Sequence, residues 1–142
     1  MHILCGNTAA FAPASDSQRF HLCVANTNGL SAEGRWEQVL NRCESFTALI
    51  ETHCTASMQA SLPYVARDFH LHWGAPVRQG SRTGVAALVK QGSLWQTKTI
   101  SLADTPLDKY YKNGRLLLVQ IFYGCGARSM LIYIVYGPAG AR

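Results

Sequence analysis

The chain is poor in charged residues, and acidic residues are the scarcer kind. Of its 142 residues, 15% are charged, with 13 Lys and Arg against 8 Asp and Glu, whereas 48% are hydrophobic. This composition argues against a disordered chain and fits one globular domain with a sizeable core. The net charge of +5 is compatible with a polyanionic partner, although a basic surface alone does not identify that partner.

Several targeting and redox signals are missing as well. No hydrophobic run approaches the length of a membrane span. Residues 1–19 lack a basic start, and Asn7 and Pro13 interrupt their apolar residues, which argues against a signal peptide. The five cysteines are odd in number and include no Cys-x-x-Cys pair, so a reducing compartment is the simpler expectation. We therefore expect an intracellular protein, nuclear or cytoplasmic, without a membrane partner.

Two short apolar segments each end on a polar side chain. Residues 46–50 run straight into Glu51, and residues 20–25 run into Asn26. Runs this short, bounded by polar residues, are typical of buried strands. Between them lies one helical face, formed by Trp36, Val39, Leu40 and Cys43. A strand–helix–strand unit makes the two strands parallel, so Asn26 and Glu51 are expected at the same edge, where open α/β sheets carry ligand sites.

Capping residues predict where the helices begin. Ser31 is the expected N-cap of the first helix. Thr55 is the expected N-cap of a second helix, with Met58 and Leu62 on one face. Pro63 is expected to kink or end that helix, because proline lacks the N–H donor and clashes with the preceding turn.

Histidines cluster on the next expected strand, over residues 69–73. His70 and His72 alternate with apolar residues and are expected on one side of that strand. A zinc site needs further ligands, and none stands at a convincing spacing, so a solvent-facing pair is the simpler interpretation. His53, which follows Glu51 by two residues, is interpreted as incidental.

The rest of the chain is expected to be mostly β. Residues 1–19 are interpreted as a poorly ordered lead-in, and residues 20–142 as the domain. Later strands are expected over 84–90, 94–102, 115–123 and 129–136, the last two as a hairpin, with loops over 74–83 and 104–114. The order β-α-β-α followed by strands excludes a regular doubly wound fold. It predicts an α/β domain with a mixed, mostly antiparallel sheet and two helices on one face.

Four short motifs stand in order at the ends or starts of these strands. They are NTNGL at 26–30, ET at 51–52, GVAAL at 84–88 and VYGP at 135–138. Together they resemble the first half of the endonuclease/exonuclease/phosphatase family, the DNase I-like fold, and most closely its retrotransposon-type endonucleases. The resemblance extends from about residue 20 to residue 138.

The resemblance implies a four-layer α/β sandwich that hydrolyses phosphate esters with a divalent metal, Mg²⁺ or Mn²⁺. Glu51 matches the family's metal-binding glutamate, and Asn26 matches the asparagine that helps to place metal and phosphate. Tyr136 stands where many members have a tyrosine that contacts the phosphate; from the residues alone, packing is an equal alternative for this side chain. On the residues alone, Glu51 and Asn26 are simply polar residues after strands. With the resemblance, the metal-binding and phosphate-binding interpretation of Glu51 and Asn26 is preferred instead.

The sequence also departs from the family. Asn28 replaces an acidic residue, and Ala139 stands where several members have asparagine. The later family motifs, an Asp-x-Asn pair and an Asp-His pair, do not occur before Arg142. The expectation is therefore the N-terminal part of a metal-dependent endonuclease or phosphodiesterase, with the C-terminal half absent and little or no activity as this chain.

Partners follow from the same interpretation. The expected partner is nucleic acid, with DNA favoured over RNA, and its backbone would meet Arg78, Arg82 and Lys90. An ordinary solvated loop explains these cations equally well. Two alternatives remain open: a non-catalytic module that binds nucleic acid or phosphate, and a gene fragment without function. In the fragment, an uncovered sheet face would favour self-association.

Overall fold

The computed structural model describes residues 2–7, 20–62, 68–91, 95–123 and 128–137, and its side chains from residue 20 onward. The described residues form eight strands and three helices. In chain order they are β1 His2–Asn7, β2 Leu22–Asn26, α1 Arg35–Asn41, β3 Phe46–Ile50, α2 Ala56–Ser61, β4 Phe69–Trp73, β5 Val85–Lys90, β6 Trp95–Thr99, α3 Asp108–Lys112, β7 Leu116–Tyr123 and β8 Arg128–Val135.

The first sheet has the strand order β2-β3-β5-β4. Strands β2 and β3 are parallel, with Asn26 paired to Ile50, and helix α1 connects them. This confirms the strand–helix–strand unit predicted from the two apolar runs. Strand β5 is antiparallel to both β3 and β4. The sheet is therefore mixed, as predicted.

The second sheet has the order β1-β8-β7-β6, and its strand pairs are all antiparallel. Strands β7 and β8 pair along their full lengths, as predicted for the last two strands. Their connection lies outside the described residues. Strand β1 pairs with β8 from His2 to Asn7, so the prediction that residues 1–19 form no regular element is wrong for this stretch.

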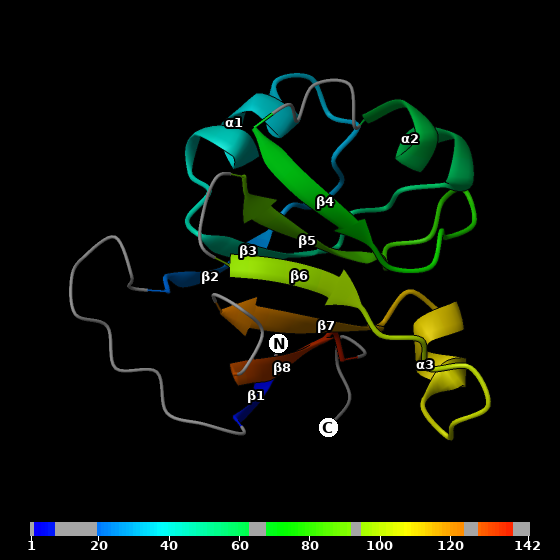
Figure 1. The fold of residues 1–142 in the computed structure, drawn as a ribbon. Helices are drawn as coiled ribbons and strands as arrows, with labels where there is room; N and C mark the ends of the chain where they lie inside the picture. The colour runs from blue at the N-terminus through cyan, green and yellow to red at the C-terminus, as the bar shows by residue number, and fades with distance from the viewer. Residues whose placement is uncertain (1, 8–19, 63–67, 92–94, 124–127, 138–142) are drawn as a thin grey trace.

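The two sheets pack face to face, as Figure 1 shows. Apolar residues from both sheets meet in one core, among them Phe46, Ala48, Val85, Leu117, Val119, Ile132 and Ile134. Each of these side chains is no more than 1% exposed. The sequence predicted a single sheet with one face uncovered. That prediction is wrong, because β1, β6, β7 and β8 form the second sheet that covers this face.

Helices α1 and α2 cover the outer face of the first sheet (Figure 1). Trp36 and Val39 of α1 pack with Leu49 and Leu88 of the sheet. Thr55 is the N-cap of α2, as predicted, and the backbone N–H of Thr55 donates to Met58 Sδ at 3.5 Å. The α1 prediction was less accurate: the N-cap is Gly34, with a left-handed φ of 70°, rather than Ser31. Pro63 lies outside the described residues.

A short helix, α3, replaces part of the loop predicted over 104–114. It spans Asp108–Lys112, and Tyr111 at its end packs with Leu116 and Leu118 on the outer side of the second sheet. Strand β6 is shorter than predicted and ends at Thr99. Within the described residues, no helix is long and apolar enough to cross a membrane.

Candidate functional site

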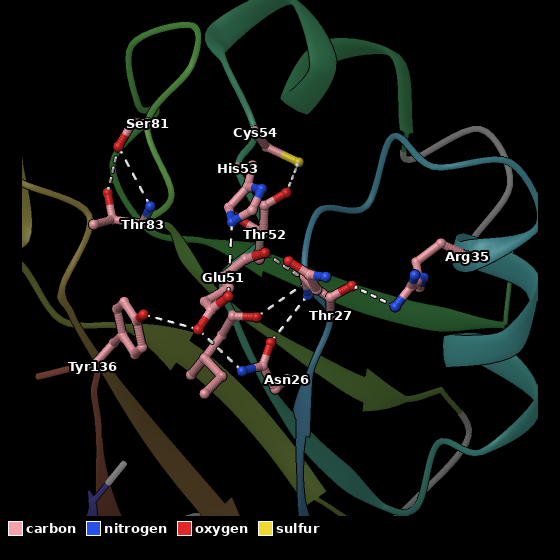
Figure 2. A network of polar contacts seen from close by, with 12 residues as sticks. Asn26, Thr27, Arg35, Glu51, Thr52, His53, Cys54, Ser81, Thr83 and Tyr136 are labelled. Atoms are coloured by element: carbon pink, nitrogen blue, oxygen red, sulfur yellow. Dashed lines mark hydrogen bonds and ion pairs between the residues drawn. The ribbon is translucent and has the colours of Figure 1, made fainter. Parts of the chain in front are cut away.

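Asn26 and Glu51 lie side by side at one edge of the first sheet. Asn26 Nδ2 donates to Glu51 Oε1 at 3.0 Å, as Figure 2 shows. The parallel register places Asn26 opposite Ile50, so the residue after β3 emerges next to the end of β2. The predicted juxtaposition of an amide and an acid from two separate strands is confirmed.

The turn after β2 is tied to the turn after β3 through their main chains. Thr27 is 1% exposed, and its Oγ1 donates to the carbonyls of Ile50 at 3.0 Å and Glu51 at 2.9 Å. The backbone N–H of Gly29 donates to the Glu51 carbonyl at 2.8 Å. Arg35 of α1 in turn donates to the Thr27 carbonyl at 2.9 Å. These contacts fix the backbone on which the Glu51 side chain stands.

Asn26 is oriented by its own turn. Its Oδ1 accepts a hydrogen bond from the backbone N–H of Asn28 at 3.0 Å, which directs its amide nitrogen toward the carboxylate. An amide nitrogen donates hydrogen bonds and does not ligate magnesium. In this geometry Asn26 orients the Glu51 carboxylate, and the prediction that Asn26 helps to place a metal and a phosphate stays a prediction.

Tyr136 reaches the same carboxylate from the second sheet. It follows β8, and its hydroxyl donates to Glu51 Oε1 at 2.8 Å (Figure 2). The guanidinium of Arg115, which precedes β7, lies over the Tyr136 ring, with Cζ 5.6 Å from the ring centroid. The Arg115 carbonyl also accepts a hydrogen bond from the backbone N–H of Tyr136. The structure thus brings together the three residues that carry the predicted site.

These contacts set the charge state of the carboxylate. The hydrogen bond from Tyr136 lowers the pKa of Glu51 below 4.5, and the bond from Asn26 and the charges of His53 and Arg82 act in the same direction, against partial desolvation. The same bond raises the pKa of Tyr136 above 10, because ionising the phenol would remove the donated proton and place two negative charges together. At neutral pH, Glu51 is therefore an anion beside a protonated phenol.

His53 belongs to the site, although it was interpreted from the sequence as incidental. Its Nε2 lies 3.9 Å from Glu51 Oε2, too far for a hydrogen bond but close enough for attraction when the ring is protonated. Nε2 is buried and has no hydrogen-bond partner among the described residues. The signal that could have identified it was its position, two residues beyond the acid at the edge of the sheet.

The backbone around the site is strained at three non-glycine residues. Asn28, Glu51 and His53 have φ values of 45°, 53° and 55°, in the left-handed region. Such conformations cost roughly 1–2 kcal/mol for residues with a Cβ, and they persist where the surrounding structure imposes them. Here the hydrogen bonds between the two turns impose them. The strain allows Glu51 and His53 to face the same side of the turn.

The three cations predicted to meet nucleic acid do not lie together. Arg78 and Arg82 are carried on the loop between β4 and β5, which leads back to the site through Thr83. Lys90 ends β5, whereas Val85, at the start of β5, pairs with Ile50 next to Glu51. Five residue-to-residue steps along the strand separate Val85 from Lys90, or roughly 16 Å. Lys90 therefore lies at the opposite end of β5 from Glu51.

Of the two histidines of β4, His72 has a different environment from the one predicted. The apolar residues of β4 lie on the other side of the strand, as predicted, and pack with residues of α1. His72 Nε2 and Thr97 Oγ1 lie 2.6 Å apart, and His72 Nδ1 lies 3.3 Å from Thr99 Oγ1, so His72 contacts β6 rather than solvent. Burial lowers its pKa below 6.5. His70 is exposed, as expected.

The donor set around Glu51 fits a hydrated Mg²⁺ in part. Magnesium takes oxygen ligands, keeps several waters and needs only one or two carboxylates. Glu51 Oε2 accepts no hydrogen bond from the described residues, so it remains available to a cation. Across the described ranges, however, no group of three or more His, Cys, Asp or Glu side chains could enclose a metal ion. The arrangement suits an open, water-rich metal site with one carboxylate.

No protein-family model matches the chain, and no curated protein matches it. The fold shown is a mixed α/β arrangement of two sheets and three helices.

Proposed function

We propose that this chain carries a divalent-cation and phosphate-ester site of the endonuclease/exonuclease/phosphatase type, which acts on or binds nucleic acid. In this proposal the fold is part of a DNase I-like four-layer sandwich. Glu51 holds a hydrated Mg²⁺ or Mn²⁺, Asn26 orients Glu51, and Tyr136 contacts a phosphate. The observation that carries the proposal is the meeting of these three side chains at one carboxylate oxygen.

The chemistry of the three groups supports this assignment. A bound Mg²⁺ would neutralise charge on a phosphate and polarise its P–O bonds. Glu51 is ionised at neutral pH, because Tyr136 and Asn26 both donate to its Oε1. A Tyr136 hydroxyl that keeps its proton can rotate between Glu51 and a phosphate oxygen as a hydrogen-bond donor. These residues bind and orient; none of them removes a proton from water.

The same geometry implies weak turnover by this chain. Hydrolysis needs a group that accepts the proton of the attacking water. Glu51 is unsuited because its lowered pKa makes it a weak base. His53 Nε2 lies 3.9 Å from Glu51 Oε2, but it is buried and makes no hydrogen bond among the described residues, so it is poorly placed to accept a proton from water. We therefore expect binding of the cation and of nucleic acid, with little or no catalysis.

Nicking of supercoiled plasmid in Mg²⁺ tests the catalytic part. Purified chain is expected to leave the plasmid intact at concentrations where it binds DNA in a gel-shift assay. Glu51→Ala, and Lys90→Gln at the opposite end of β5, serve as matched variants. Mg²⁺-dependent nicking by the wild-type chain that Glu51→Ala abolishes and Lys90→Gln retains would contradict the expected inactivity. It would also identify Glu51 as catalytic.

A second candidate function is a binding module without any metal chemistry. The observation in its favour is the single carboxylate at the site, since the described residues offer no cluster of three metal-binding side chains. This candidate predicts salt-sensitive binding of DNA in EDTA and no additional binding when Mg²⁺ is added. Tighter DNA binding with Mg²⁺, lost in Glu51→Gln, would favour the metal site instead.

A further inference from the structure

A pocket opens beside the Glu51 site, on the side of His53. Its volume is about 800 Å³. The described side chains around it are hydroxyls, amides, one methionine and two basic groups, with no aspartate or glutamate among them. The lining residues are Asn28, Ser31, His53, Thr55, Ser57, Met58, Gln79, Gly80, Ser81 and Arg82. Hydrogen-bond donors and a guanidinium without a competing carboxylate are what an anion requires.

This pocket shares a wall with the carboxylate site. His53 lines the pocket, and its Nε2 lies 3.9 Å from Glu51 Oε2. On its other side the ring abuts Gly29, where an added Cβ would come within 3.0 Å of Nδ1. Asn28 also lines the pocket, and its backbone N–H donates to Asn26 Oδ1. A ligand in the pocket is therefore adjacent to a ligand at Glu51.

Arg82 stands on a loop held by hydrogen bonds. The hydroxyls of Ser81 and Thr83 lie 3.0 Å apart, and the backbone N–H of Thr83 donates to Ser81 Oγ at 3.3 Å. Thr83 Oγ1 also donates to the Asn113 carbonyl at 3.0 Å, which ties the loop to the turn before β7. Figure 2 shows Ser81 and Thr83 on the same side of the site as His53. The guanidinium is exposed, and its charge reaches far enough to lower the pKa of Glu51.

We propose that this pocket binds a phosphate group of a polynucleotide strand, next to the phosphate that faces Glu51. Arg82 supplies the charge, and the side chains of Ser31, Thr55 and Ser57 supply neutral donors. A pocket of about 800 Å³ is of the size that holds a nucleotide-sized ligand, rather than one free phosphate ion. This proposal depends on the proposed function in one respect only, that a neighbouring phosphate faces Glu51. Binding in the pocket itself needs no metal.

Fluorescence anisotropy of a labelled ten-nucleotide oligothymidine, measured in EDTA over a range of salt, tests the pocket. Arg82→Gln is expected to weaken binding roughly three- to tenfold, as for one partly exposed charge-assisted hydrogen bond. It is also expected to reduce the slope of log K against log salt by about 0.7, the value for one phosphate contact on a single strand. Arg42→Gln, the matched change at the end of α1 away from the pocket, is expected to change neither quantity.

The controls distinguish the pocket from a general charge effect, from binding of free phosphate and from the proposed metal site. Equal weakening by Arg82→Gln and Arg42→Gln would show that only overall charge matters, and would overturn the pocket. Inorganic phosphate that shifts the NMR signals of His53 and Ser57, when the oligonucleotide does not bind, would overturn the polynucleotide assignment. Glu51→Gln is expected to leave oligonucleotide binding in EDTA undiminished. A wild-type chain that binds no Mg²⁺ but keeps the Arg82-dependent binding of oligonucleotide in EDTA would therefore count against the proposed metal site alone.

Discussion

Tyr136 and Glu51 are 85 positions apart and follow strands of different sheets, yet the Tyr136 hydroxyl donates to Glu51 Oε1 at 2.8 Å. The bond joins the edges of the two sheets above their shared core. Glu51 follows β3 directly, and Tyr136 follows β8 directly, so each side chain is placed by the register of a buried strand. Neither of the two side chains in this contact is carried by a mobile loop.

Replacing Tyr136 by phenylalanine removes the largest influence that lowers the pKa of Glu51. The pKa of Glu51 is expected to rise toward 4.5, and the free energy of unfolding to fall by about 1 kcal/mol, the net value of one hydrogen bond. A ¹³C NMR titration of the carboxyl group measures the first change, and urea unfolding the second. Tyr110→Phe, on the exposed side of α3, is the control. An unchanged Glu51 titration in Tyr136→Phe would show that the bond does not form in solution.

Acid is expected to remove the contribution of Glu51 to stability. Because its pKa is lower in the folded state than 4.5, the carboxylate stabilises the fold above that value. This stabilisation is lost as the pH falls through the lower, folded pKa. The difference in unfolding free energy between wild type and Glu51→Gln should therefore be largest near neutral pH and shrink below about pH 4. Urea unfolding at pH 6 and pH 3 measures it.

Glu37→Gln, an exposed acid on α1, controls for the general loss of one negative charge. A difference between wild type and Glu51→Gln that stayed constant across this pH range would contradict the lowered pKa.

Gly84, which precedes β5, is expected to tolerate no side chain. Its φ is +112°, and an added Cβ would overlap the Thr52 hydroxyl and approach the backbone nitrogen of His53 to 3.2 Å. Thr52 is 1% exposed, so it has little room to move. Gly84→Ala should lose more than about 2 kcal/mol of stability, combining left-handed strain with overpacking.

Gly34→Ala is the matched control for this change, because Gly34 also has a positive φ but has no atom within 4 Å of an added Cβ. Its cost should stay near 1 kcal/mol. Thermal unfolding of the two variants compares them directly. Equal losses of stability in the two variants would show that crowding of the added Cβ against Thr52 and His53 contributes nothing.

Buried apolar runs allowed much of the first sheet to be predicted. The segments 46–50 and 85–90 are short and almost wholly apolar, and both are interior strands. The site followed from the polar residues at the ends of β2 and β3, because these strands are parallel neighbours and their register alone brings Asn26 beside Glu51. Most of the information about the candidate site therefore came from which residues stand at the strand ends.

The remainder depended on contacts distant in sequence. Helix α3 has only five residues, too few for a periodic apolar face, and was predicted as loop. Strand β1 is defined by its pairing with β8 at the other end of the chain. The sequence places His53 two residues after Glu51, but the left-handed backbone that turns it toward the carboxylate is imposed by the neighbouring turn and has no local signal. Local patterns could not show any of these three features.

The most direct test of the proposed metal site is a titration with Mn²⁺, followed by the broadening of amide signals in ¹H–¹⁵N NMR spectra. We expect broadening at low Mn²⁺ to centre on Asn26, Glu51 and Tyr136, to be reversed by excess Mg²⁺, and to disappear in Glu51→Gln. Broadening that centres elsewhere, or that persists unchanged in Glu51→Gln, would contradict the claim that this carboxylate holds a divalent cation.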